Sequence, residues 1–169
     1  KQLPKRPKLI ALDTMDFWMQ IALDDLLNVI KEIDVLTIND EEARLLSGEL
    51  SLKKAANKIL TMGPKYLIIK KGEHGALLFD KNNHVFSAPA LLLEEVFDPT
   101  GAGDTFAGGF MGYLSSQEEI NWDSMKKAII AGSAMASFTV EKFGIERLEN
   151  LSKSEIDTRI NQFREMTTF

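Results

Sequence analysis

The chain has 169 residues, and 44% of them are hydrophobic, which is enough for a folded domain with its own core and excludes a disordered protein. Its formal net charge of −5 argues against nucleic acid or an anionic membrane as the main partner. There is no cysteine, so disulfides, thiolate metal sites and cysteine nucleophiles are excluded, and a reducing, cytoplasmic location is expected.

The start of the chain shows no targeting segment. Residues 1–8 are basic but lack the apolar core of a signal peptide, and no apolar run approaches the length of a membrane span. Because the sequence does not begin with methionine, we expect it to be a fragment of a longer protein or a processed product.

Strands and helices alternate over the first 70 residues. The hydrophobic pattern predicts strands at 8–13, 34–38 and 66–70, and helices at 16–33, 39–46 and 52–62. Asn39 and Ser51 are suited to begin the second and third of these helices, and Gly48 is suited to end the second. Three large apolar side chains near the first helix are expected to be packing residues: Met15, Phe17 and Trp18.

The remaining residues predict a hairpin followed by helices. The hairpin has strands at 76–79 and 84–86, and the helices cover 102–115, 122–142 and 152–166. This order predicts a single α/β domain over residues 1–169, with a mostly parallel sheet and helices on both of its faces. Ligands of such sheets bind at the carboxyl ends of the strands, where Asp13, Asn39 and Lys70 fall.

The most informative stretch is residues 98–110, which place a turn and a glycine-rich loop ahead of an apolar helix. Gly101 and Gly103 allow a positive φ and a close approach of a ligand to the backbone. The free N–H groups at the start of the helix form an anion site, and Asp104 lies in the same first turn. An anion site beside a carboxylate suits phosphoryl transfer, although an aspartate in a first turn can also be only part of a helix cap.

This stretch resembles the C-terminal signature of the ribokinase-like (PfkB) carbohydrate and nucleoside kinases. The match is carried by residues 98, 101–104 and 106. The resemblance implies that Asp104 is the catalytic base that takes the proton from the acceptor hydroxyl. It also implies that the backbone of Gly101, Ala102 and Gly103 forms the hole for the transferring phosphoryl group.

Asn39 and Glu42 match the Asn-x-x-Glu motif of the same family, which implies that they organise Mg²⁺ through water and the phosphates of ATP. The alternative from spacing alone is an ordinary helix N-terminus. Lys70, Lys71, Gly72 and Gly75 resemble the loop beneath the nucleotide phosphates. Lys70 stands where many members have threonine, and an ammonium also binds phosphate; the alternative here is a lysine-rich hairpin turn.

Residues 131–144 predict a small-residue helix that packs closely and ends in glycine. The resemblance implies that this helix also lines the adenine pocket, with Ser133 near the purine and Gly144 in the adjoining loop. It further implies a monovalent cation site, with K⁺ held through carbonyls by the loop of residues 140–144 together with Asp98 and Thr100.

The resemblance covers nearly the whole chain but only the C-terminal, nucleotide-binding part of the family. It implies an ATP-dependent kinase for a small sugar, with the acceptor site and a lid missing, so this piece alone is expected to be inactive. A homo-oligomer formed through the lid is also expected. The alternatives are a nucleoside or vitamin-alcohol kinase of the same family and a non-catalytic module in assembly or regulation.

Overall fold

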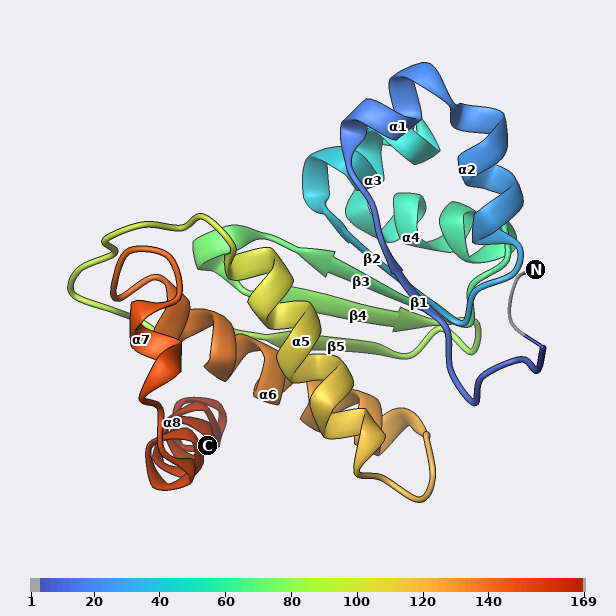
Figure 1. The fold of residues 1–169 in the computed structure, drawn as a ribbon. Helices are drawn as coiled ribbons and strands as arrows, with labels where there is room; N and C mark the ends of the chain where they lie inside the picture. The colour runs from blue at the N-terminus through green and yellow to red at the C-terminus, as the bar shows by residue number, and fades with distance from the viewer. Residues whose placement is uncertain (1–3, 169) are drawn as a thin grey trace. The chain divides into compact units, whose positions relative to one another are not determined.

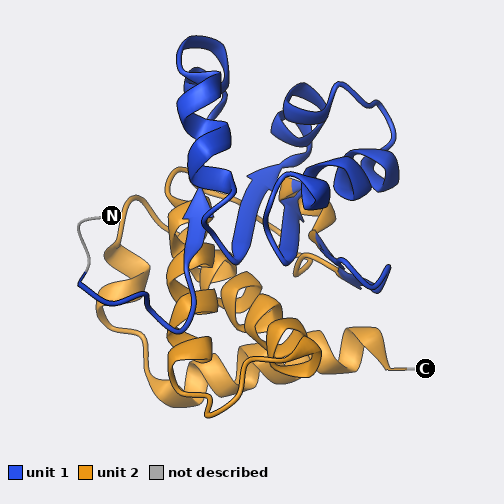
Figure 2. Cartoon of the chain, turned by 90° about the vertical axis from the view of Figure 1, so that its right-hand side faces the viewer, with its two compact units in different colours: residues 1–71, 77–87 blue, residues 72–76, 88–169 orange. Residues whose placement is uncertain are grey.

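The computed structural model describes residues 4–168 of the chain (Figure 1). Residues 1–3, which begin the basic stretch, lie outside the described residues. The chain divides into two compact units, drawn in two colours in Figure 2. Unit 1 comprises the residues up to 71 together with 77–87, and unit 2 comprises residues 72–76 and 88–169. The single domain expected from the sequence stays a prediction.

A five-stranded sheet forms the frame of unit 1. Its strands lie in the order of the sequence: β1 (Ala11–Asp13), β2 (Val35–Asn39), β3 (Tyr66–Lys70), β4 (Ala76–Asp80) and β5 (Val85–Ala88). The first three are parallel, with Asp13 paired to Thr37 and Asn39 paired to Lys70. Only five residues separate β3 from β4, too few for a crossover, so β4 runs back beside β3. β4 and β5 form the expected hairpin, with the Asp80 N–H donating to the carbonyl of His84 across its turn (3.4 Å). The predicted fold class, a mostly parallel α/β sheet flanked by helices, is confirmed.

Four helices belong to unit 1: α1 (Asp16–Ile21), α2 (Leu23–Ile30), α3 (Asp40–Ser47) and α4 (Leu52–Thr61). α3 packs on β2 and α4 packs on β3. Their apolar sides meet the sheet in one core, which includes Leu26, Ile30, Leu36, Ile38, Ile59, Leu67, Ile69 and Phe79. Val35, Ile68 and Leu78 alternate with these residues and are also buried, so the strands are covered on both faces, as in parallel sheets generally.

The single helix predicted over residues 16–33 is wrong, because the chain leaves helical geometry at Ala22 (φ −145°, ψ 42°). The N–H of Ala22 donates to the carbonyl of Trp18, and its own carbonyl accepts from Leu26. Ala22 thus ends α1 and begins α2. Apolar spacing continues through this break, so periodicity alone does not reveal it.

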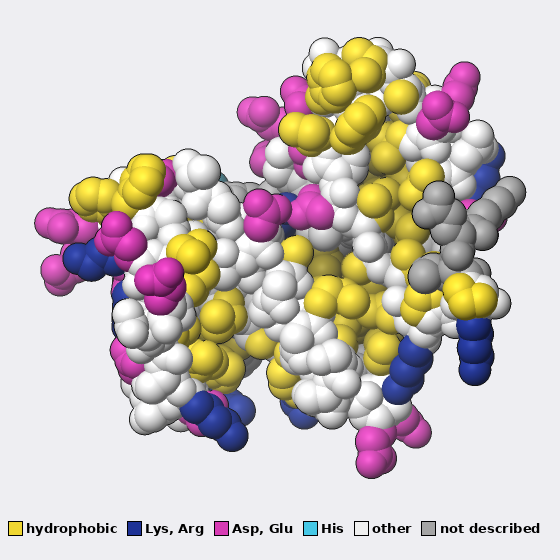
Figure 3. Space-filling view, viewed as in Figure 1, with side chains coloured by type: hydrophobic (Ala, Val, Ile, Leu, Met, Phe, Trp, Pro, Cys, Tyr) yellow, Lys and Arg dark blue, Asp and Glu magenta, His cyan; other side chains and the backbone are white. Residues whose placement is uncertain are grey.

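α1 turns much of its apolar surface outward. Met15, Phe17 and Trp18 are each about half exposed, so their expected role as packing residues is wrong, and Met19 is the buried side chain of the helix. Figure 3 shows hydrophobic side chains gathered over α1. Phe17 and Trp18 contact each other edge to face, with ring centroids 5.2 Å apart.

Unit 2 is helical. It contains η1 (Gly72–His74), α5 (Ala102–Ser115), α6 (Trp122–Thr139), α7 (Glu146–Glu149) and α8 (Lys153–Thr167). Two glycines let α5 and α6 pack closely, since a Cβ at Gly109 would overlap Met135 and one at Gly132 would lie 2.7 Å from the carbonyl oxygen of Phe106. The close packing expected from the small residues is therefore confirmed. None of the helices in residues 4–168 is long and apolar enough to cross a membrane.

The end of α6 differs from the sequence expectation. The helix stops at Thr139 rather than 142, and its C-cap is Val140 instead of a glycine. Gly144 has a positive φ of 57°, but it serves the loop that follows and not the helix end. α7 was not expected, because four residues give too short a pattern to detect.

Candidate active site

Polar side chains meet at the carboxyl ends of the parallel strands of unit 1. Asp13 ends β1, Asn39 ends β2 and Lys70 ends β3, as the sequence predicted. Glu42 joins them from the first turn of α3. We call these four residues the strand-end cluster: Asp13, Asn39, Glu42 and Lys70.

Asn39 and Glu42 form a reciprocal helix cap. The Asn39 Oδ1 accepts from the N–H of Glu42 (2.8 Å), and the Glu42 Oε2 accepts from the N–H of Asn39 (2.7 Å). The capping role considered from the sequence is therefore present. The Glu42 side chain belongs to a buried residue, and burial raises the pKa of its carboxyl; the Asn39 N–H and the Lys70 ammonium lower that pKa, while Asp13 and Asp16 raise it.

Asp13 and Lys70 form an ion pair that sequence reasoning did not identify. The Lys70 Nζ lies 2.7 Å from the Asp13 Oδ2, although 57 residues separate the two in the chain. The two side chains are 21% and 30% exposed, so the pair lies at an accessible edge. The available signal was that both residues end strands of one parallel sheet; the order of those strands was not known.

The loop after β3 has a structural reason for its second glycine. Gly72 (φ 56°) and Gly75 (φ 83°) both take left-handed geometry. A Cβ at Gly75 would overlap the carbonyl oxygen of Ala88, whereas one at Gly72 would meet open space. The loop is a tight 3₁₀ turn, with the Gly75 N–H donating to the carbonyl of Gly72 (3.1 Å).

The start of α5 in unit 2 is the helix N-terminus for which the sequence predicts an anion site, and that role stays a prediction. Gly101 is its N-cap with a left-handed φ of 81°, and no side chain caps the helix. The first-turn amides are therefore not covered by a side chain, and Asp104 is exposed in that turn. The amide of Ala102 is already engaged with the carbonyl of Pro99 (3.2 Å), which leaves Gly103 as the better donor within the expected hole.

The loop before α5 is joined to the end of α6. The carbonyl of Val140 accepts from the N–H groups of Phe97 (2.7 Å) and Asp98 (3.4 Å). The Asp98 Oδ1 accepts from the N–H of Thr100 (2.9 Å), and this bond, with one from the Thr100 hydroxyl, lowers the pKa of Asp98. Asp98 thus lies beside Val140, the first residue of the loop that the resemblance implies for a cation site, and that site stays a prediction. Ser133 lies on α6, two turns before its end.

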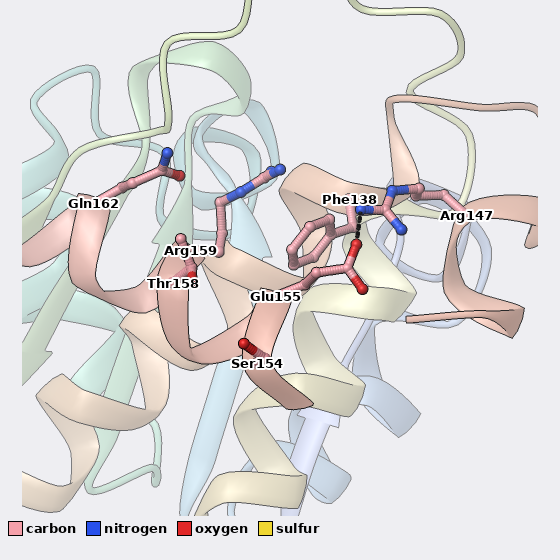
Figure 4. A pocket seen from close by; sticks show the side chains of 7 residues that line it. All are labelled: Phe138, Arg147, Ser154, Glu155, Thr158, Arg159 and Gln162. Carbon is pink, nitrogen blue, oxygen red and sulfur yellow. Dashed lines mark hydrogen bonds and ion pairs between the residues drawn. The ribbon is translucent and has the colours of Figure 1, made fainter. Parts of the chain in front are cut away.

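A shallow pocket of about 190 Å³ lies between the end of α6, α7 and α8 (Figure 4). The guanidiniums of Arg147 and Arg159 lie 5.0 and 3.9 Å from the ring centroid of Phe138. Glu141 accepts from both arginines, at 2.9 and 2.6 Å, and Glu155 accepts from Arg147 at 2.7 Å. These charges are paired with one another, and the ion pairs hold α7 and α8 to the end of α6. The sequence analysis did not predict this pocket.

Comparison with known proteins identifies the family. Residues 9–150 match the model of the "pfkB family carbohydrate kinase". The chain belongs to the PfkB family. Within this family, a ribokinase of Staphylococcus aureus is 35% identical over 121 residues, which make up 68% of this chain and 37% of that protein. A cytidine kinase of Thermococcus kodakarensis is 37% identical over 88 residues, or 52% of this chain and 32% of that protein.

A solved structure agrees with the fold. A putative ribokinase II of Escherichia coli, in complex with ATP and Mg²⁺, superposes with a TM-score of 0.73 at 26% identity. The match covers 91% of this chain and 49% of that protein. The chain therefore spans about a third to a half of the length of these PfkB relatives.

Proposed function

We propose that the parent protein, meaning the natural polypeptide that contains residues 1–169, transfers the γ-phosphoryl group of ATP to a hydroxyl of a sugar. The observation that carries this proposal is the start of α5, where Gly101 leads into an uncapped helix with Asp104 exposed in its first turn. Membership of the PfkB family and a ribokinase relative support the reaction class. Charge gathers on the phosphoryl group in such a reaction, and helix amides favour it there.

In this mechanism the Asp104 carboxylate accepts the proton of the acceptor hydroxyl. The hydroxyl oxygen forms its bond to the γ-phosphorus while the bond to the bridging oxygen of ADP breaks. The backbone amides near Gly101 and Gly103 offset the charge on the phosphoryl oxygens, with Ala102 contributing once its bond to Pro99 is replaced. Catalysis then depends on positioning and electrostatics, as in phosphoryl transfer generally.

Mg²⁺ fits the strand-end cluster as a partner of the nucleotide phosphates. Within residues 4–168, no group of three or more acidic or histidine side chains could hold a metal by itself. Mg²⁺ keeps several waters and binds through one or two carboxylates plus phosphate, so the single carboxylate of Glu42, oriented by Asn39, suits that mode. The ion would supply neutralisation of phosphate charge.

The rest of the nucleotide site is proposed from the same resemblance. Lys70, Lys71, Gly72 and Gly75 would contact the phosphates, and Ser133 would lie near the adenine. A monovalent cation such as K⁺ would sit where Asp98, Thr100 and the loop of residues 140–144, including Gly144, come together. The hydrogen bonds from Phe97 and Asp98 to Val140 support that meeting of segments.

The decisive test replaces Asp104 by Asn in the parent protein. Loss of a general base lowers turnover by about 10²–10⁴-fold, while ATP binding measured by calorimetry should stay close to that of the wild type. Asp123→Asn is the matched control, because Asp123 is also an exposed aspartate in the first turn of a helix. Turnover near the wild-type rate in Asp104→Asn would remove Asp104 from the mechanism, whereas a wild-type parent protein without any turnover would favour a non-catalytic module.

A nucleoside acceptor is the second candidate, favoured by the cytidine kinase relative at 37% identity. The two candidates share every residue proposed above and differ only in the acceptor. Kinase assays of the parent protein with ribose, other sugars and cytidine, each at equal concentration, would distinguish them by kcat/KM.

A further inference from the structure

The Lys70 ammonium at the end of β3 reaches past β2, the middle strand of three, to Asp13 at the end of β1. β1 and β3 are both neighbours of β2 and not of each other, so the 2.7 Å contact between Lys70 and Asp13 passes over the carboxyl end of β2. Thr37 and Asn39 lie on one face of β2, and they are the register partners of Asp13 and Lys70. The ion pair therefore ties together the ends of β1 and β3 on that face.

Asp13 is itself fixed. Its Oδ1 accepts from the N–H of Thr14 (3.0 Å), and its Oδ2 takes Lys70. Each oxygen thus has a separate donor, so the carboxylate has little freedom to turn. A lysine side chain carries its ammonium on a flexible stem of four carbons. An ion pair with a fixed carboxylate therefore restricts where the Lys70 ammonium can lie.

The surroundings of the pair contain polar groups that the protein does not satisfy. Among residues 4–168, the hydroxyls of Thr14 and Thr37 are buried without a hydrogen-bond partner, and Thr37 is only 5% exposed. Buried polar groups of this kind usually have a partner, and exceptions point to a bound water, ion or ligand. The edge of the sheet that carries Asp13 and Lys70 thus has hydroxyl groups that are available to hydrogen-bond a bound ligand, ion or water.

Stability does not explain the pair well. An ion pair between groups that are 21% and 30% exposed is screened by water, and such pairs contribute little to folding. An ammonium has three donor hydrogens, and Asp13 occupies one. Lys70 can therefore keep its bond to Asp13 and still donate to another anion.

We propose that Asp13 is a positioning residue, which holds the Lys70 ammonium where it donates to a phosphate group of the nucleotide. The inference rests on the proposed function for the ligand, but the pair itself is a property of unit 1. Asp13 supplies the restraint that the long, flexible side chain of Lys70 needs. Preorganisation of this kind raises affinity by removing the cost of ordering the side chain on binding.

The test is a double-mutant cycle in the parent protein. The variants are Lys70→Met, Asp13→Asn and the two combined, and calorimetry gives the affinity of each for ATP and for adenosine. Lys70→Met should weaken ATP binding about tenfold or more, as expected for loss of a charge-assisted hydrogen bond, and leave adenosine binding unchanged. Asp13→Asn should weaken ATP binding severalfold in the wild-type background and not at all when Lys70 is already Met.

The sign of the Asp13→Asn effect separates positioning from simple charge. Removal of a negative charge near a phosphate should tighten ATP binding if only the net field matters. Positioning predicts the opposite as long as Lys70 is present. The matched control is the exposed ion pair of α6, with Lys126→Met and Asp123→Asn, which should leave ATP affinity unchanged.

Three results would overturn the inference. Tighter or unchanged ATP binding in Asp13→Asn would contradict positioning, and equal losses for ATP and adenosine would indicate a structural role. If Asp13→Asn fails to fold, Asp13→Glu, which keeps the charge but moves it, takes its place and should weaken ATP binding more than adenosine binding. The third contradicting result is an Asp13→Glu variant that does not do so. A parent protein that binds no ATP at all would instead refute the proposed function, and that outcome is read from the wild type alone.

Discussion

At the scale of the residue, glycine at position 75 is required by the backbone before any ligand is considered. Its φ of 83° is left-handed, and a Cβ there would overlap the carbonyl oxygen of Ala88. Gly72 shares the left-handed geometry but faces open space. Gly75 is thus required both by its backbone conformation and by the lack of space for a Cβ, whereas Gly72 is favoured by its backbone conformation alone.

We expect Gly75→Ala to destabilise the protein by at least about 2–3 kcal/mol, because strain from the left-handed backbone adds to a direct clash. Gly72→Ala should cost only about 1–2 kcal/mol, since it has only the strain. Denaturant unfolding of both variants measures the difference. Equal losses would show that the contact with Ala88 is relieved by a small movement of the backbone.

The site residues illustrate what a sequence can and cannot reveal at this scale. The positions of Asp13, Asn39 and Lys70 at strand ends followed from pattern, because strand boundaries are local. The bond between Asp13 and Lys70 did not, because it depends on which strands are neighbours. The burial of Glu42 was also not foreseen, since a first-turn glutamate is exposed in most helices.

At the scale of the element, α8 is fastened by charge. Ser152 begins the helix with a reciprocal cap, in which the Glu155 Oε2 accepts from the Ser152 N–H (3.0 Å). The other oxygen of Glu155 accepts from Arg147 of α7. Hydrogen bonds from Ser152 and then Arg147 lower the pKa of Glu155 from 4.5 to about 2.

This shift predicts a dependence of stability on acid. A carboxyl whose pKa is lower in the folded state than in the unfolded state stabilises the protein at pH values above the unfolded-state pKa. That stabilisation is lost as the pH falls towards the folded-state pKa. The contribution of Glu155 should therefore be complete above pH 4.5 and decline from there towards pH 2. Glu155→Gln should remove this part of the decline in the free energy of unfolding, measured by denaturant titration across that range. Glu165→Gln, an exposed glutamate of the same helix, is the control and should keep the wild-type slope.

Most element boundaries were predictable, and the exceptions have physical causes. α5 was placed correctly at 102–115, because a glycine turn and an apolar run mark its start. The break at Ala22 was missed since alanine favours helices and no proline or glycine signals an end. The end of α6 at Thr139 was placed three residues late because the apolar pattern runs on through Val140.

At the scale of the whole molecule, two compact units divide the proposed machinery between them. Asp13, Asn39, Glu42 and Lys70 belong to unit 1, whereas Gly101 and Asp104 belong to unit 2. The strand-end cluster and the start of α5 are each preformed by contacts within their own unit. That the strand-end cluster and the start of α5 act on the same nucleotide is part of the proposed function.

The chain spans about a third to a half of the length of its PfkB relatives. Apart from Asp104, the residues proposed above all serve the nucleotide. We therefore expect residues 1–169, produced alone, to bind ATP weakly and to phosphorylate no sugar. Without residues that hold the acceptor near the γ-phosphate, the advantage of a bound pair of reactants, roughly 7–11 kcal/mol at best, is largely lost. Calorimetry with ATP and a kinase assay over a panel of sugars and nucleosides measure the two halves of this expectation. Circular dichroism must first show that the chain is folded. Robust phosphorylation by residues 1–169 would place an acceptor site within this chain, and a folded chain that binds no nucleotide would favour a non-catalytic role.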